Sequence, residues 1–273
     1  MENNFNEISK IAHDSLEIGD KLFSDKKYEE ALKQYNTALY NFSKLIAPNN
    51  FHDHSRAYFS GKIAQCYIKP NNVNEAIHNF EASMNLEPIL EFIYNLTSIY
   101  YIDMDYDKTF VYSKILLETA NKNLPSYDNE YYKSEAIKFL LDLENRNYEI
   151  ARRYLTEYFK NIFVCNFESI ILNTSLYFLS AEKGMWRDGY KNLKEINYMD
   201  NAYKNNCINF LENQIMSVKS HMRYHEFDNK FISYVLKNVT YDIVISEELL
   251  NAIKEVIILK LSEKKTEFEE SIY

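Results

Sequence analysis

The sequence predicts an all-α protein, and three observations lead to that prediction. The chain has 273 residues but only four glycines and four prolines, whereas β and α/β proteins with many tight turns normally need more of both. Apolar residues recur at the i, i+3, i+4, i+7 spacing of an amphipathic helix. Short polar segments, rather than glycine-rich or proline-rich loops, separate these stretches.

The first two helices are expected at about residues 6–23 and 28–42. The polar turn Ser-Asp-Lys-Lys at 24–27 separates them. In the second, small and large apolar residues alternate on one face, which indicates a helix that packs closely against a neighbour. The members of this face are Tyr28, Ala31, Leu32, Tyr35, Ala38, Leu39 and Phe42.

The same plan recurs in the next stretch. Ser55 could cap a helix that runs to Ile68. A turn follows at 69–72, and a second helix ends before Pro88, because proline disfavours a helical conformation in the residue that precedes it.

Two stretches of the chain resemble the tetratricopeptide repeat, a unit of two antiparallel helices with small and aromatic residues at fixed positions. Residues 57–90 carry all six signature positions, and residues 12–45 carry most of them, although Leu22 replaces the first aromatic and the closing proline is missing. The matching residues are Ala64, Tyr67, Ala76, Phe80, Ser83 and Pro88 in one stretch, and Gly19, Tyr28, Ala31, Tyr35 and Ala38 in the other. Small residues at these positions are expected to let paired helices approach closely, Gly19 against Ala31 and Ala64 against Ala76.

Degenerate repeats are expected at 90–123, 130–163 and 168–202. Their turns are placed at 105–107, at 145–148 and at Gly184-Met185-Trp186. The resemblance therefore implies a right-handed α-solenoid of TPR-like helix-turn-helix repeats over residues 1–200.

Residues 201–273 are predicted to form a C-terminal helical capping segment. Helices are expected at about 203–223, 227–238 and 247–270, the last with Ser246 as its N-cap. A solenoid needs a terminal unit whose outer face is polar, because an apolar face would continue to stack.

Net charge and cysteine content exclude several classes of partner and compartment. The net charge of −9 disfavours nucleic acid and anionic membranes, since an acidic chain gains no counterion release from phosphates. No apolar run is long enough to cross a bilayer, and the first residues, which lack a basic segment followed by an apolar run, are not expected to form a signal peptide. An odd number of cysteines, three, fits a reducing compartment, so a cytoplasmic location is expected.

Sites for cofactors, metals and catalysis are not predicted. Gly184 and Gly189 have Walker-like spacing, but Tyr190 stands where lysine is required. The histidine pairs His52/His54 and His221/His225 lack further ligands in the sequence and are interpreted as solvated surface residues. We therefore expect neither an enzyme nor a cofactor.

The concave surface of the repeats is the expected binding site, with another protein or a peptide as its partner. The branch of the family that clamps acidic chaperone C-termini uses lysine, arginine and asparagine, whereas Asp20 and Glu91 here would repel such a tail. The groove residues expected from the repeat register are His13, Leu16, Asp20, Phe23, Tyr58, Gly61, Ile68, Tyr94, Ser98 and Tyr101.

Three functions stay open at this point. The favoured one is a non-catalytic scaffold or adaptor that binds a peptide or protein segment in this groove. The alternative is a peptide-sensing regulator similar to bacterial quorum-type proteins built on degenerate repeats, and an enzyme has no positive support. The groove could also be covered by the chain's own N-terminal segment or by self-association.

Overall fold

The computed structural model describes residues 2–44, 51–68, 72–122, 126–221, 231 and 246–273, without the side chains of 2–6, 51, 52 and 221. The chain divides into two compact units, residues 1–148 and 149–273. The sequence predicted a division at residue 200, whereas the boundary lies between Tyr148 and Glu149. The two helices of the predicted repeat 130–163 therefore belong to different units.

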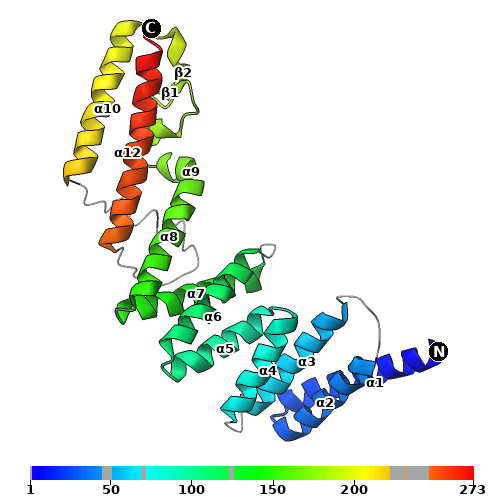
Figure 1. The fold of residues 1–273 in the computed structure, drawn as a ribbon. Coiled ribbons are helices and arrows are strands. Elements are labelled where there is room, and N and C mark those ends of the chain that lie inside the picture. Colours follow the sequence, from blue (N-terminus) through cyan, green and yellow to red (C-terminus); the bar gives the residue numbers. More distant parts are fainter. Residues whose placement is uncertain (1, 45–50, 69–71, 123–125, 222–230, 232–245) are drawn as a thin grey trace. The chain divides into compact units, whose positions relative to one another are not determined.

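The first unit consists of helices that pack against their neighbours in chain order, so the all-α prediction is confirmed here. Helix α5 also packs against α7. The ribbon in Figure 1 shows three successive pairs, α1–α2, α3–α4 and α5–α6, followed by α7. The helices are α1 (Glu2–Ser24), α2 (Tyr28–Lys44), α3 (Phe51–Ile68), α4 (Val73–Leu86), α5 (Leu90–Ile102), α6 (Tyr106–Lys122) and α7 (Tyr127–Asn145).

Two of the predicted boundaries in this unit are wrong. Ser55 lies inside α3, which begins at Phe51, so Ser55 is not its N-cap. The turn expected at 105–107 lies one to two residues earlier, because Tyr106 already begins α6.

One type of turn recurs at the end of every odd-numbered helix of the first unit. A backbone N–H five residues further along donates to a carbonyl in the last turn of the helix: Lys27 to Leu22, Asn72 to Tyr67, Asp105 to Tyr100 and Tyr148 to Leu143, at 2.9–3.0 Å. This is the bond of a Schellman motif, which satisfies a carbonyl that the helix leaves free. Three of these turns place a non-glycine residue at positive φ, namely Lys26, Met104 and Asn147. The recurrence shows that the unit is built from similar helical hairpins.

Small residues allow the close helix contacts in the core. Ala64 and Ala76 lie in one buried cluster with Phe80 and Phe92, as the repeat pattern predicted. At Gly19 the closest contact is with Tyr35, since a Cβ on the glycine would lie 2.8 Å from the Tyr35 ring.

Gly61 allows a close contact between successive hairpins. A Cβ built on this residue would lie 2.1 Å from Cε2 of Phe92, and Phe92 is fully buried. The absence of a side chain at Gly61 therefore lets α5 approach α3.

In its described residues, the second unit consists of helices and one short hairpin of strands. Helices α10 and α12 pack together, and α12 also packs against α8. The elements are α8 (Glu149–Cys165), α9 (Phe167–Ile171), the 3₁₀ helix η1 (Tyr177–Ser180), strands β1 (Met185–Arg187) and β2 (Leu193–Glu195), the 3₁₀ helix η2 (Ile196–Tyr198), α10 (Asn201–His221) and α12 (Glu247–Glu270).

The C-terminal helices agree with the sequence where the structure describes them. Helices α10 and α12 confirm those predicted at 203–223 and 247–270. The Ser246 hydroxyl accepts the Leu249 N–H at 3.2 Å, so this N-cap is confirmed. The helix predicted at 227–238 lies outside the described residues, except residue 231.

The helical repeat predicted at 168–202 is wrong. Instead of two helices, this stretch holds the antiparallel pair β1–β2, in which Trp186 lies opposite Lys194. The Asp188 carboxylate forms the turn by accepting the N–H groups of Tyr190 and Asn192 at 2.9 and 3.0 Å, and Lys194 pairs with it at 3.0 Å. Asp188 favours a turn over a helix at this point, because its carboxylate accepts the backbone N–H of the residue two positions later.

Trp186 and Lys264 attach this segment to the helices. The Trp186 ring lies 5.2 Å from Phe178 and 5.3 Å from Phe268, centroid to centroid. Lys264, 5% exposed, donates to the carbonyls of Ala181, Glu182 and Met185 at 3.1–3.3 Å. Its ammonium also pairs with Glu267 at 2.9 Å. A buried ammonium is stable here because every donor has an acceptor.

The Gly61–Phe92 contact generates a prediction about stability. We expect Gly61→Ala to lower the free energy of unfolding by about 2 kcal/mol, because overpacking costs more than the roughly 1 kcal/mol that alanine gains over glycine in a helix. Urea unfolding followed by circular dichroism measures the change. Gly189→Ala is the control, since nothing lies within 4 Å of its Cβ position. A urea midpoint that is higher in Gly61→Ala than in the wild type would contradict this account of the contact between α3 and α5.

The buried Lys264 generates a second prediction. Lys264→Met is expected to cost about 3 kcal/mol, because three carbonyls lose the hydrogen bond of the ammonium and the half-buried Glu267 carboxylate loses its cation. Lys260→Met is the matched control on the same helix, where the ammonium pairs with Glu263 but is 41% exposed. Equal unfolding free energies for the two variants would show that Lys264 does not hold the segment.

Candidate functional site

The residues predicted to line the groove lie on the three helices that the repeat register indicated. His13, Leu16, Asp20 and Phe23 are on α1, Tyr58 and Ile68 on α3, and Tyr94, Ser98 and Tyr101 on α5. His13 is exposed and the other eight are half-buried. The structure therefore brings most of this set to the surface of the first unit.

Several members of the set contribute to helix packing instead of lining a groove. Leu16 packs against two buried clusters, and Ile68 packs against a third. Gly61 is covered by Phe92. The helical register alone does not distinguish packing residues from groove residues, because a side chain at the edge of a helix–helix interface faces both the core and the surface.

The part of the surface formed by α1 and α3 combines aromatic rings with one ammonium. Lys62 Nζ lies 5.3 Å from the Tyr58 ring centroid and 5.9 Å from that of Phe23. At such distances the rings attract the cation. On α1, Asp20 accepts a hydrogen bond from the buried Tyr35 hydroxyl at 2.7 Å.

Helices α3 and α5 are joined on this side by a polar pair. Gln65 Nε2 donates to Glu91 Oε1 at 2.7 Å. Gln65 is buried and its Oε1 has no hydrogen-bond partner.

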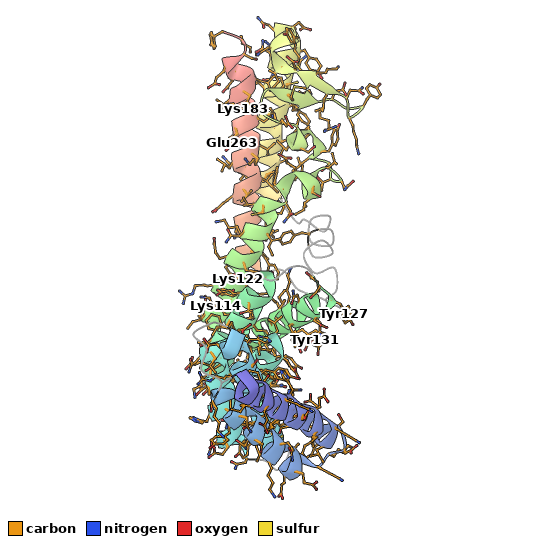
Figure 2. The ribbon with its side chains drawn as sticks, turned by 90° about the vertical axis from the view of Figure 1, so that its right-hand side faces the viewer. Lys114, Lys122, Tyr127, Tyr131, Lys183 and Glu263 are labelled. Carbon is orange, nitrogen blue, oxygen red and sulfur yellow. The ribbon has the colours of Figure 1, made fainter. Side chains whose placement is uncertain are left out.

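A tyrosine cluster joins α5 to α7. The Tyr94 ring lies 5.8–6.3 Å from the rings of Tyr131, Tyr132 and Phe139. We use the name tyrosine surface for Tyr58, Tyr94, Tyr131 and Tyr132 together with Glu91. In Figure 2, Tyr131 and the 87% exposed Tyr127 lie on one side of the first unit, and Lys114 and Lys122 of α6 lie on the other.

Tyr101 is not free to bind a ligand through its hydroxyl. That hydroxyl donates to Asp142 at 2.8 Å and accepts from Arg146 at 3.3 Å. The Arg146 guanidinium lies 5.7 Å from the Tyr101 ring and 5.6 Å from the Tyr106 ring. Tyr101, a predicted groove residue, therefore belongs to a network that fixes the C-terminal end of α7.

Burial and nearby carboxylates raise the pKa of the tyrosines on this surface. Burial raises the pKa of Tyr132 to about 12, with a further contribution from the negative charge of Glu91. The pKa of Tyr58 is also raised, first by burial and then by Asp20 and Glu91, against an opposing effect of Lys62. Glu91 of α5 therefore acts electrostatically on a tyrosine hydroxyl of α3 and on one of α7.

Sequence reasoning missed the contribution of α7. Tyr131 occupies the register position in 130–163 that Tyr58 occupies in 57–90. Extending the register by one more repeat would have found it. Gln65 and Glu91 could not be paired from the sequence, since the pairing depends on how closely Gly61 lets α5 approach α3.

The second unit has a separate pocket of about 910 Å³ between the end of α8, α9, η1 and α12. Its lining carries side chains of both charges. Two of them are labelled in Figure 2: Lys183, which lies between η1 and β1 in the sequence, and Glu263 of α12. Lys264 also lines it, but its ammonium is bound by the carbonyls described above. The free Cys165 thiol is exposed at its edge.

Metal ligands do not gather in the described part of the chain. Within it, no group of three or more histidine, cysteine, aspartate or glutamate residues could hold an ion. His54 instead pairs with Glu87 at 2.9 Å. The side chains of His52, His221 and His225 lie outside the described residues.

Cys66, Cys165 and Cys207 are free thiols, and burial raises the pKa of Cys66 and of Cys207 to about 11. Buried thiols with so high a pKa are poor nucleophiles. Among the described helices, none has the length and apolar character needed to cross a membrane.

Comparisons with protein-family models, with curated proteins and with solved structures find no match to this chain. Function is therefore inferred from the geometry of the tyrosine surface.

The raised pKa of Tyr132 predicts a dependence of stability on pH. Because its pKa in the folded state exceeds the ordinary value of about 10, its contribution is complete below pH 10 and is lost as the pH rises towards 12. Between these pH values the unfolding free energy should therefore fall less steeply in Tyr132→Phe than in the wild type. Urea titrations at a series of pH values measure it, with Tyr127→Phe, an exposed ring, as the control. An unchanged slope in Tyr132→Phe would contradict the assignment.

Proposed function

We propose that this protein is a non-catalytic scaffold or adaptor that binds a peptide or protein segment on the tyrosine surface of its first unit. The proposal includes a right-handed, TPR-like α-solenoid for that unit. The recurring Schellman turn and the tetratricopeptide-like residues of 12–45 and 57–90 support this reading. A cytoplasmic location belongs to the same proposal.

One observation carries the proposal: the alternate helices α3, α5 and α7 present the partly exposed rings of the tyrosine surface together with the Glu91 carboxylate. Tyr94 contacts the α7 rings, and Glu91 is bonded to Gln65 of α3. Tyrosine gives a large contact area at a low cost in conformational entropy, and it supplies a hydroxyl for hydrogen bonds. Such a surface suits an extended or helical peptide.

The charge of the chain narrows the class of partner. A net charge of −9 opposes binding to nucleic acid and to anionic membranes. Asp20 and Glu91 oppose an acidic peptide such as a chaperone C-terminus. A neutral or basic protein segment is the partner that this surface favours.

A selection from a displayed random-peptide library tests the proposal. We expect peptides recovered on the whole protein to protect α3, α5 and α7 from hydrogen exchange. Tyr131→Ala should weaken their binding about tenfold, because truncating an aromatic anchor costs about 1–2 kcal/mol.

Tyr40→Ala is the matched control, since Tyr40 is an exposed tyrosine, 62% accessible, on α2. Thermal unfolding of both variants verifies that they are folded. Selected peptides that protect only α2, α4 or α6, or that bind Tyr131→Ala as tightly as wild type, would refute this function.

A further inference from the structure

The Gln65–Glu91 pair has an unsatisfied acceptor. Gln65 is 8% exposed, and its Nε2 is used by Glu91 while its Oε1 has no donor. Most buried polar atoms in proteins have a partner, and a buried acceptor without one costs about 1–3 kcal/mol. A donor supplied by a ligand would remove this cost.

The pair is part of the tyrosine surface. Tyr58, Lys62 and Gln65 follow one another at i, i+4 and i+7 on α3, so they share one face of the helix. Glu91 and Tyr94 are three residues apart on α5 and likewise share a face. The Glu91 carboxylate acts electrostatically on both Tyr58 and Tyr132.

The charges around the pair favour a cation. The charged groups that act on the Tyr58 and Tyr132 hydroxyls are the carboxylates of Asp20, Glu91 and Asp128 and the ammonium of Lys62. Lys62 lies over the rings of Tyr58 and Phe23, on the side of α1. The lysines labelled on α6 lie on the opposite side of the unit (Figure 2).

We infer that Glu91 and Gln65 form the recognition site for a basic side chain, arginine above all, of the bound peptide. This inference rests on the function proposed above and names the chemistry of its partner. One N–H of the guanidinium would donate to Glu91. Another would donate to the Oε1 of Gln65, which is enclosed in the unbound protein and would become accessible through a side-chain rearrangement of the kind that is common on binding. The rings of Tyr58 and Tyr132 would flank the cation.

Arginine fits this arrangement better than lysine. Its planar guanidinium presents several donors in a fixed fork, whereas the lysine ammonium is a point charge. Two acceptors that are bonded to each other, as in the Gln65–Glu91 pair, match such a fork. Attraction between a guanidinium and a tyrosine ring adds about 0.5–2 kcal/mol, depending on desolvation.

Short fluorescent peptides made of repeated Arg-Leu-Ala units are the probe. Matched peptides carry citrulline, which keeps the shape of arginine without its charge, or glutamate. We expect the arginine peptide to bind the whole protein at least about tenfold more tightly than the citrulline peptide, as measured by fluorescence anisotropy. The preference should decrease at high ionic strength, since salt screens partly exposed charges.

Glu91→Gln is the decisive variant, because an amide at this position can still accept from Gln65 while the charge is removed. We expect it to abolish the preference for arginine over citrulline. Glu118→Gln is the matched control: Glu118 is a half-exposed carboxylate on α6, beside Lys114 at 3.8 Å. This control should keep the preference of the wild type.

Failure of the inference is distinguishable from failure of the proposed function. Equal binding of the arginine and citrulline peptides, tighter binding of the glutamate peptide, or an unchanged preference in Glu91→Gln overturns the cation site. If neither probe binds a protein that does bind a library-selected peptide through Tyr131, the cation site is also overturned and the scaffold function stands. If no library-selected peptide binds through Tyr131 either, both the cation site and the scaffold function are overturned.

Discussion

The contact between Gly61 and Phe92 is the constraint on which the first unit depends. Each helix carries an apolar stripe that must be covered, and covering it requires the next hairpin to approach closely. A missing side chain at Gly61 lets the Phe92 ring fill the space beside α3, in one buried cluster with Ala64 and Ala76. The same approach brings Glu91 within hydrogen-bonding distance of Gln65. Core packing and the polar pair of the tyrosine surface thus have a common cause.

The tyrosine surface combines two properties that usually oppose each other. Its rings are sufficiently buried to raise the pKa of Tyr58 and Tyr132, yet they keep part of their area exposed. Burial fixes the ring positions through contacts between α5 and α7, so little entropy remains to be lost on binding. Carboxylates beside the rings then make the surface selective for charge rather than merely apolar.

Much of the first unit could be predicted from the sequence, whereas in the second unit the prediction holds for α10, α12 and the Ser246 N-cap but not for the stretch 168–200. Periodicity and the repeat signature located α1, α2 and α4 closely, because the small and aromatic positions of 12–45 and 57–90 specify helix pairing. In the stretch 168–200 the predicted turn at 184–186 is wrong, because Met185 and Trp186 lie in β1 and the turn follows at Asp188-Gly189, residues that favour turns. Among site residues, Tyr94 and Asp20 were found by register, whereas the Gln65–Glu91 pair depends on a distance between helices that no one-dimensional pattern contains.

Lys264 makes the second unit dependent on contacts between distant parts of the chain. Its ammonium binds the carbonyl of Ala181, 83 positions earlier, whereas successive helices of the first unit meet their immediate neighbours. Contacts of large sequence separation slow folding, because the intervening loop must close before any of them is gained. During synthesis the hairpin β1–β2 therefore emerges long before the helix that secures it, and we expect the second unit to reach its native state more slowly than the first.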